Sequence, residues 1–352
     1  MNPDVAQFEA LGKELLRRCL AEEEPADLHA WATQALAHIG GTTDASAVLR
    51  WKDSFTYYEE LLRQRAAMAL LPPDQRRQID WPWASWNRLI SPMKPGMLAS
   101  ISAPDGEGKT IVVECLAEHW AARGHRVAFV HYELNRELMM DRRTARHTSI
   151  VVRMLESGML TPEQEAIIQA VRPRLEAWEG EINYVHTPGW TMEQTVAELR
   201  RLREEGLCDV VVIDYLEKAF ASARQLKMYG ANYWLREADN VEMLKSFAES
   251  AKLPVIMVTQ LNKAGKTIEA AKMDRSDIGG SGEKSTKANL VVLLKRETNA
   301  DGSRSNVVRV RIDKNTMGAD GAFVQYMQPE FFRLADIHEA GNNNNGRSHT
   351  AN

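Results

Sequence analysis

The sequence predicts an α/β protein with a mostly parallel central sheet, preceded by a small all-helical N-terminal domain. Two observations support this class. Residues 1–75 carry apolar residues only at helical spacing, whereas from about residue 82 short apolar runs alternate with helical stretches. That alternation is typical of βαβ units, in which helices cover both faces of a parallel sheet. With 352 residues the chain can form one large domain and one small one.

The N-terminal domain, residues 1–75, is expected to contain three helices. They are predicted over residues 5–20, 27–39 and 44–72. Prolines and charges then predict a linker over residues 76–95. This stretch contains Trp81, Trp83 and Trp86, which we expect to pack in the core of the sheet; docking on a neighbouring subunit is the alternative.

The α/β domain is expected over residues 96–338 and should contain eight strands. They are predicted at residues 97–102, 126–132, 182–186, 209–214, 254–260, 289–297, 306–314 and 322–327. The last two alternate and are separated by a glycine-containing turn, which predicts an edge hairpin. Thr161 and Thr191 should begin two helices, because a glutamine three residues later completes the capping-box pattern. The asparagine-rich tail, residues 339–352, is expected to be disordered.

Composition excludes several classes of protein. The net charge is −4, so no overall positive field attracts nucleic acid or anionic lipid, and such binding must come from a local patch. Cys19, Cys115 and Cys208 are odd in number and far apart, which predicts free thiols and no metal site. No apolar run approaches the ~18 residues of a membrane span, and the N-terminus lacks a signal-peptide pattern. We therefore expect a cytoplasmic protein without a membrane partner.

A phosphate-binding loop is predicted within residues 102–114, SAPDGEGKTIVVE. It follows the pattern G-x-x-x-x-G-K-[ST] except at the first glycine, which is Ala103. An apolar strand precedes it and an amphipathic helix follows, so backbone N–H groups and the helix N-terminus can hold phosphates. Lys109 would reach the terminal phosphates and Thr110 would bind Mg²⁺; a turn with a surface lysine is the alternative. The candidate nucleotide-binding residues are Ala103, Pro104, Asp105, Gly106, Glu107, Gly108, Lys109, Thr110 and Ile111.

Three further polar residues end or follow apolar strands. Asp214 ends one strand, where a carboxylate can reach Mg²⁺ at the carboxyl edge of a parallel sheet. Gln260 ends another, where it can sense the γ-phosphate, and Glu133 follows a third. Each has a structural alternative: Asp214 as a turn residue, Glu133 as a helix N-terminal carboxylate favoured by the dipole, and Gln260 as a partner of the backbone.

In this order the segments resemble the DnaB-like replicative helicases, ring-forming enzymes with a RecA-like P-loop NTPase core. The similarity extends to VHYELNRELMMDR, HTPGWTMEQTVAELRRLREEG, VVVIDYLEKA, VIMVTQLNK and RSDIGGSGEKSTKANLVVLLKRE. It covers roughly residues 80–338. The resemblance implies a homohexameric ring, with ATP bound between subunits and single-stranded DNA in the channel. It also implies a primase or a helicase loader as protein partner, and a compact motor of this kind fits a phage or mobile element.

The resemblance assigns roles to residues, and the sequence departs from it at one of them. It implies that Glu133 activates the attacking water, and that ATP is bound with Mg²⁺ beside Lys109. The family carries an arginine two residues after the hairpin lysine, which acts on the neighbouring subunit's ATP; here Lys314 is kept but Thr316 holds the arginine position. Lys314 or Arg311 is expected to take over that role.

Two segments, residues 218–237 and 262–289, are expected to face the channel. The second has six basic against four acidic residues and is rich in glycine, as a loop that follows a nucleic-acid backbone requires. The family's Arg-Glu pair is replaced there by Gly279-Gly280, which leaves backbone amides to contact phosphates. A solvated surface loop is the alternative. The candidate DNA-binding residues are Lys263, Lys266, Lys272, Arg275, Gly279, Gly280 and Lys284.

These expectations combine into an ATP-dependent DNA helicase motor acting on single-stranded DNA during replication. The alternative is a RecA-fold ATPase that works as a recombination mediator, a switch or an assembly factor without unwinding. The missing arginine and the Gly-Gly pair favour that alternative, whereas the strand-end motifs favour the helicase.

Overall fold

The chain divides into two compact units, Met1–Arg76 and Arg77–Asn352, which we describe separately. The computed structural model describes residues 12–19, 28, 51, 54–72, 76–132, 136–261, 272–278 and 283–337. In the first unit, a helix covers residues 12–19 and α3 (Ser54–Leu70) has no buried side chain. Both lie within predicted helices. The tail at residues 339–352, and residues 27–39 apart from Leu28, lie outside the described residues.

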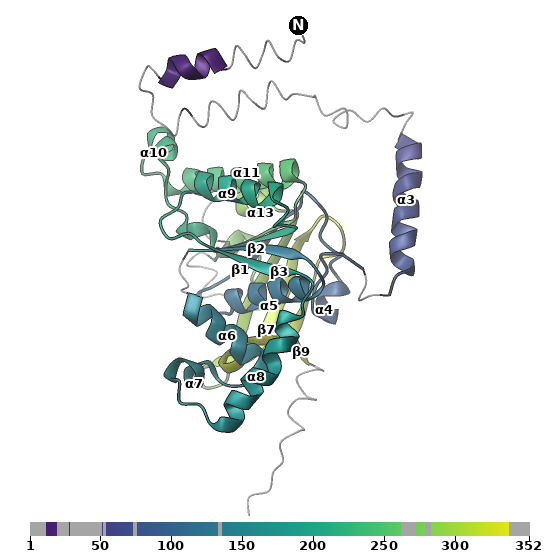
Figure 1. Ribbon diagram of the computed structural model, residues 1–352, viewed down its shortest axis with the longest axis vertical. Helices are drawn as coiled ribbons and strands as arrows, with labels where there is room; N and C mark the ends of the chain where they lie inside the picture. The colour runs from purple at the N-terminus through teal and green to yellow at the C-terminus, as the bar shows by residue number, and fades with distance from the viewer. Residues whose placement is uncertain are drawn as a thin grey trace, which may run out of the picture. The chain divides into compact units, whose positions relative to one another are not determined.

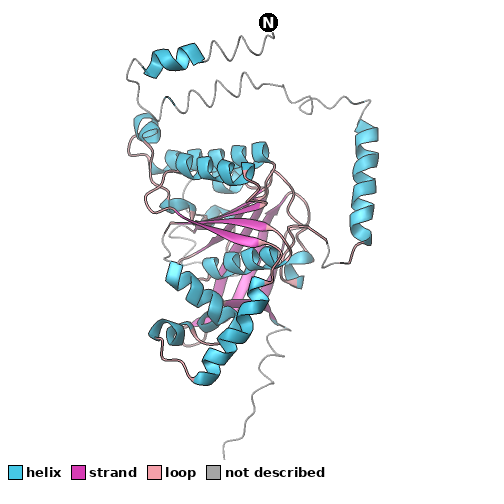
Figure 2. Cartoon of the chain, in the orientation of Figure 1, coloured by secondary structure: helices cyan, strands magenta, loops and turns pink. Residues whose placement is uncertain are grey.

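The second unit is built on a nine-stranded sheet (Figures 1 and 2). Its order is β3-β2-β4-β5-β1-β6-β7-β8-β9, parallel from β3 to β6 and antiparallel from β7 onward. All eight predicted strands are confirmed. The strands are β1 (Leu98–Ala103), β2 (Arg126–His131), β3 (Glu181–His186), β4 (Val210–Asp214), β5 (Val255–Gln260), β6 (Leu290–Thr298), β7 (Arg304–Asn315), β8 (Gly321–Gln328) and β9 (Arg333–Asp336).

Helices cover both faces of the sheet, which explains why its central strands are almost wholly apolar. On one face Leu116 of α5 packs with Val212 and Val258; on the other, Phe247 of α11 packs with Met257. Figure 1 shows α5 and α6 on one side and α9, α11 and α13 on the other. The helices are α4 (Ala84–Asn87), α5 (Lys109–Ala122), α6 (Arg136–Thr148), α7 (Val152–Ser157), α8 (Pro162–Glu176), α9 (Met192–Glu204), α10 (Ala223–Tyr229), α11 (Tyr233–Ala251) and α13 (Glu283–Lys287), with 3₁₀ turns η4 (Leu216–Lys218), η5 (Arg275–Asp277) and η6 (Pro329–Phe331).

Local signals set the helix starts as predicted. Thr161 accepts a hydrogen bond from the backbone N–H of Gln164, and the Gln164 side chain accepts one from the N–H of Thr161. The same reciprocal pair forms between Thr191 and Gln194 at the start of α9. Among the helices of the described residues, none combines the length and the apolar character that crossing a bilayer requires.

The predicted edge hairpin needs a correction. β7 and β8 pair as expected, but β9 pairs antiparallel to β8, so β8 lies inside the sheet. The strand escaped prediction because it has only four residues, too few to display alternation, and directly follows a 3₁₀ turn.

Of the segment predicted as a linker, residues 76–95, all but Arg76 belong to the second unit. Trp81, Trp83 and Trp86 are buried. The centroid of the Trp86 ring lies 5.2 Å from that of Trp81 and 5.2 Å from that of Trp83. The indole N–H of Trp83 donates to the carbonyl of Leu334, and that of Trp86 donates to the side-chain oxygen of Gln325. The expected core packing of the tryptophans is therefore confirmed. Prolines and charges leave this stretch only the short helix α4, but they do not exclude burial.

Candidate nucleotide-binding site

The predicted phosphate loop joins the carboxyl end of β1 to the amino end of α5. Gly106 and Gly108 have positive φ angles of 75° and 92°, a region that suits glycine. Gly108 is the N-cap of α5 and supplies no side-chain acceptor, so the first N–H groups of the helix have no side-chain cap and can donate to a bound anion. A loop of this shape at a helix N-terminus fits a phosphate group.

Ala103 replaces the first glycine of the pattern without strain. It is the last residue of β1 and pairs with Gln260 of β5, and its φ angle is not positive. An extended backbone accepts alanine as readily as glycine. The departure from the pattern at this position therefore leaves the loop intact.

Lys109 is held inside the loop by backbone carbonyls. Its ammonium donates to the oxygens of Ala103 and Pro104, both at 2.9 Å, and lies 3.7 Å from a carboxylate oxygen of Asp105. The side chain is only 8% exposed. Thr110 follows it in the first turn of α5, and both residues line the same cavity.

Glu107, one of the predicted loop residues, and Arg304, which sequence reasoning missed, anchor the loop to the β6–β7 hairpin. Glu107, which is buried, accepts a 2.7 Å hydrogen bond from the backbone N–H of Arg296. Arg304 donates to the carbonyls of Asp105 and Gly106, both at 3.3 Å, and its Nε lies 3.4 Å from Glu107. The loop motif gives no signal for these partners, because they follow it by almost two hundred residues.

Strand order brings the other predicted residues to the same edge. β5 lies between β4 and β1, so Asp214 and Gln260 end on the side where the loop follows β1. Asp214 is 6% exposed and pairs in register with His131 of β2. Glu133 follows that strand by two residues but lies outside the described residues.

A cavity of about 370 Å³ lies in front of the loop. Gln260 lines it together with Lys109 and Thr110, as do four residues not predicted: Arg142, Tyr215, Pro329 and Phe332. The Arg142 guanidinium lies 4.3 Å from the centroid of the Phe332 ring, and burial lowers the pKa of Arg142. The sequence contains a weak indication of Tyr215, because this residue directly follows Asp214. Arg142 and Phe332 had none, since the fold alone brings α6 and the turn after η6 together.

The two candidate trans-acting cations lie away from this cavity. Lys314 pairs with Val291 near the amino end of β6, the edge opposite the phosphate loop. Its ammonium donates to the carbonyls of Ser285 and Thr286, at 3.1 and 2.7 Å. Arg311 donates to the carboxylate of Asp313 at 2.7 Å. Neither side chain reaches the phosphate loop of its own subunit.

The predicted DNA-binding set requires one correction. Lys284 is fully buried, where its ammonium pairs with Glu217 and Glu237, so this side chain does not face a DNA strand. Lys272 and Arg275 are exposed, and the backbone N–H of Arg275 donates to Asp313. Four residues of the set lie outside the described residues: Lys263, Lys266, Gly279 and Gly280.

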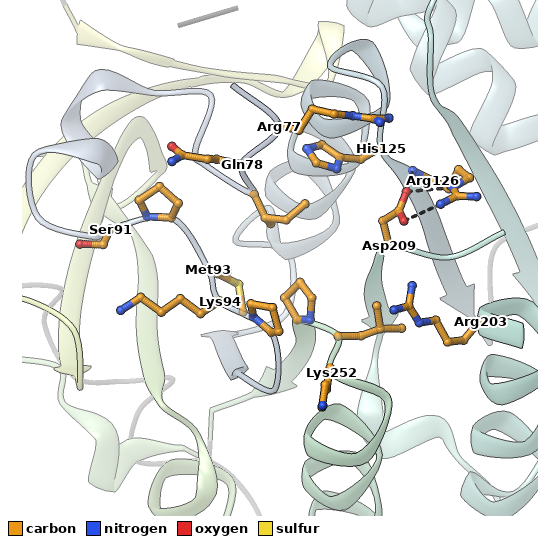
Figure 3. Close-up of a pocket in the computed structure, with 15 residues that line it drawn as sticks. Arg77, Gln78, Ser91, Met93, Lys94, His125, Arg126, Arg203, Asp209 and Lys252 are labelled. Atoms are coloured by element: carbon orange, nitrogen blue, oxygen red, sulfur yellow. Dashed lines mark hydrogen bonds and ion pairs between the residues drawn. The ribbon is translucent and has the colours of Figure 1, made fainter. Parts of the chain in front are cut away.

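A second hollow, of about 550 Å³, lies at the other edge of the sheet (Figure 3). Arg126, which begins β2, lines it, and its guanidinium donates two hydrogen bonds to Asp209, just before β4. Buried His125 lies beside them. Because this hollow adjoins the amino ends of the strands, it is separate from the phosphate loop and takes no part in the proposed site.

Comparison with known proteins identifies the family. Residues 82–336 match the family model of the DnaB-like helicase C terminal domain. The chain belongs to this family. The resemblance predicted from the motifs is therefore confirmed over most of the second unit.

Replicative helicases are similar in sequence to this chain. The replicative DNA helicase DnaB of Geobacillus stearothermophilus is 26% identical over 254 residues, which cover 71% of this chain and 55% of the relative. The replicative DNA helicase DnaC of Bacillus subtilis (strain 168) is 24% identical over 323 residues, covering 90% and 68%. A probable plasmid replicative DNA helicase of Chlamydia trachomatis is 23% identical over 243 residues, covering 69% and 51%. The chain thus spans about half to two thirds of the length of these relatives.

Solved structures confirm the predicted RecA-like α/β fold. The ATPase domain of G40P superposes with a TM-score of 0.68 at 19% identity, covering 81% of this chain and 98% of that domain. A DnaB-like replicative helicase, solved to examine its interactions with primase, gives a TM-score of 0.75 at 17% identity, covering 95% and 76%.

Proposed function

We propose that this chain is an ATP-dependent DNA helicase motor that moves along single-stranded DNA as a hexameric ring during replication. One observation carries the proposal. In a member of the DnaB-like family, the phosphate loop and Gln260 line one cavity, and Asp214 ends the strand next to that of Gln260 at the same edge of the sheet. Family membership also favours the motor over a mediator or switch, since the relatives are replicative helicases.

The residues around the cavity fit ATP hydrolysis. Lys109 and the N–H groups at the start of α5 would hold the phosphates. The buried Asp214 carboxylate and the Thr110 hydroxyl supply oxygen ligands that suit Mg²⁺, which neutralises charge on the phosphate oxygens when bound. Glu133 would accept a proton from the attacking water, and Gln260 would contact the γ-phosphate.

The position of Lys314 supports a site shared between subunits. Because it lies at the edge opposite its own phosphate loop, any catalytic role of Lys314 would be on the ATP of a neighbour. A cation acting in trans stabilises the charge of the phosphoryl-transfer transition state. The ring itself would need a protein that loads it or works beside it, and a primase or a helicase loader is our candidate partner.

DNA contact is proposed for the exposed and glycine-rich parts of residues 262–283. Lys272 and Arg275 are exposed there, and Lys263, Lys266 and the amides of Gly279 and Gly280 complete the candidate set. Contacts of this kind bind phosphates and not bases, so affinity should fall steeply with salt and depend little on sequence.

Glu133→Gln tests the chemistry. The variant should bind ATP like the unmodified protein but turn it over at least ~100-fold more slowly, because the amide cannot accept the proton. Glu137→Gln, on the first turn of α6, is the control and should retain turnover. Unchanged turnover in Glu133→Gln would remove Glu133 as the general base.

A further inference from the structure

Lys284 occupies an interior position that is unusual for a lysine. Its side chain is 0% exposed, and its ammonium donates to Glu217 at 2.6 Å and to Glu237 at 3.1 Å. Glu237 is 2% exposed, and burial raises the pKa of its carboxyl. Burying Lys284 and Glu237, with Glu217 only 11% exposed beside them, costs desolvation energy that apolar residues of similar size would not incur. Stability alone therefore does not account for this cluster.

The same Glu217 oxygen has a second partner. Glu217 Oε1 accepts the backbone N–H of Gln260 at 2.9 Å, while it also accepts from Lys284. Glu217 lies in η4, three residues after Asp214, and Gln260 lines the nucleotide cavity. One carboxylate oxygen therefore joins the end of β5 to the amino end of α13.

This link encloses the segment for which we propose DNA contact. Leu261 and Ile278 form an antiparallel bridge directly after Gln260, and α13 begins at Glu283. On one side of the segment, β5 is bonded to Glu217 through the N–H of Gln260. On the other side, α13 is bonded to Glu217 through Lys284. A shift of Gln260 on contact with a γ-phosphate would change what Glu217 accepts, and Lys284, which also donates to Glu237, could then bond to both carboxylates or to Glu237 alone.

We propose that Lys284 and Glu217 are positioning residues that couple the γ-phosphate sensor Gln260 to helix α13. The inference deepens the proposed function and rests on it. Neither residue contacts ATP or DNA. They transmit the state of the nucleotide site to α13, the helix that follows the proposed DNA-binding segment. A pair with two discrete arrangements is what such coupling requires.

Lys284→Met tests the coupling against a matched control. Lys287 lies on the same helix and pairs with Glu242 of α11 at 2.7 Å, but both side chains are well exposed. We expect Lys284→Met to lower the stimulation of ATP turnover by single-stranded DNA about tenfold, and Lys287→Met to change it less than about twofold. Basal turnover without DNA should stay within about threefold in both variants, because neither lysine touches ATP.

A second readout needs no DNA. If Gln260 is held by the Glu217 link, Lys284→Met should lower the preference for a non-hydrolysable ATP analogue over ADP by about fivefold, as measured by the ratio of the two Kd values. Lys287→Met should leave that ratio unchanged. If the unmodified protein is not stimulated by DNA, the proposed function fails, and the Kd ratio alone then decides the coupling.

A variant without charges in this cluster serves as a control for misfolding. It is needed because Lys284→Met leaves two carboxylates without their cation. Lys284→Met combined with Glu217→Gln and Glu237→Gln removes all three charges, while the amide oxygen introduced by Glu217→Gln can still accept from Gln260. We expect this triple variant to fold and bind ATP, yet to show the same loss of DNA stimulation and of nucleotide preference. Folded variants that match Lys287→Met in both readouts would overturn the proposal.

Discussion

Arg304 crosses the phosphate loop and donates a hydrogen bond from Nη1 to the carbonyl oxygen of Gly106, 3.3 Å away. Its Nη2 donates to Asp105 at the same distance, so one guanidinium from the start of β7 holds two consecutive peptide groups of the loop. A Cβ at Gly106 would come within 2.5 Å of this guanidinium. Glycine at position 106 therefore serves two purposes: it accepts the positive φ, and it leaves room for the guanidinium of Arg304.

Arg304→Ala should weaken nucleotide binding modestly. The side chain is 57% exposed, so its hydrogen bonds are screened, and we expect the KM for ATP to rise about two- to fivefold with kcat nearly unchanged. Steady-state turnover over a range of ATP concentrations measures both constants. Arg309→Ala, on the same strand but paired with Glu297, is the control and should change neither. A large fall in kcat would mean that Arg304 acts in the transition state instead.

Lys314 should act on the neighbouring subunit. Lys314→Ala alone should lose at least ~100-fold in turnover, as expected for a cation that stabilises the transition state, and Lys109→Ala should be inactive because it lacks the phosphate-binding ammonium. Mixing the two variants should restore part of the activity, since an intact Lys314 can then face an intact phosphate loop. Turnover that does not rise on mixing would contradict an action in trans.

Trp86→Ala should destabilise the second unit by about 3–5 kcal/mol. The indole is fully buried between Trp81 and Trp83 and bonds to Gln325, so its removal leaves a cavity and an unpaired polar group. Urea unfolding measures the change in free energy. Trp234, 57% exposed, provides the control, and Trp234→Ala should shift stability by less than about 0.5 kcal/mol. A loss for Trp86→Ala as small as that expected for Trp234→Ala would contradict the role of this indole in the core.

His125 should make the fold less stable in acid. Burial lowers its pKa below the usual 6.5, with Asp209 and Asp80 opposing the shift and Arg77 supporting it. As the pH falls below 6.5, the unfolded chain binds a proton that the folded chain does not. Stability then decreases by up to ~1.4 kcal/mol per pH unit until the folded-state pKa is reached, and this loss is absent above pH 6.5.

The comparison of His125→Gln with the unmodified protein at pH 7.5 and pH 5 measures this effect. The variant should lose less stability between the two values, because glutamine does not titrate. His186→Gln, at an exposed histidine, should follow the unmodified protein. Identical pH dependence in all three proteins would show that His125 titrates normally.

The sequence predicts strands and the phosphate loop well because both depend on local patterns. Near-continuous apolar runs mark β1, β4 and β5, and the loop motif marks the turn between β1 and α5. Asp214 and Gln260 end such strands, so the sequence alone indicates which edge of the sheet they occupy. Strand ends at one edge of a parallel sheet converge, so their positions along the chain suffice to place them together.

Features that depend on tertiary contact escaped prediction. Lys284 reads as one basic residue among several in a charged stretch, and nothing near it in sequence indicates that Glu217 and Glu237 enclose it. Arg304 and Phe332 reach the site from distant elements in the same way. Long-range packing decides the exposure of each of these side chains, and charge patterning along the chain does not.

Steady-state ATP hydrolysis with and without single-stranded DNA tests the central claim most directly, with Lys109→Ala as the blank. The account predicts turnover that single-stranded DNA stimulates strongly, that duplex DNA does not stimulate, and that loses this stimulation at high salt. Turnover that is independent of DNA would contradict a DNA-translocating motor.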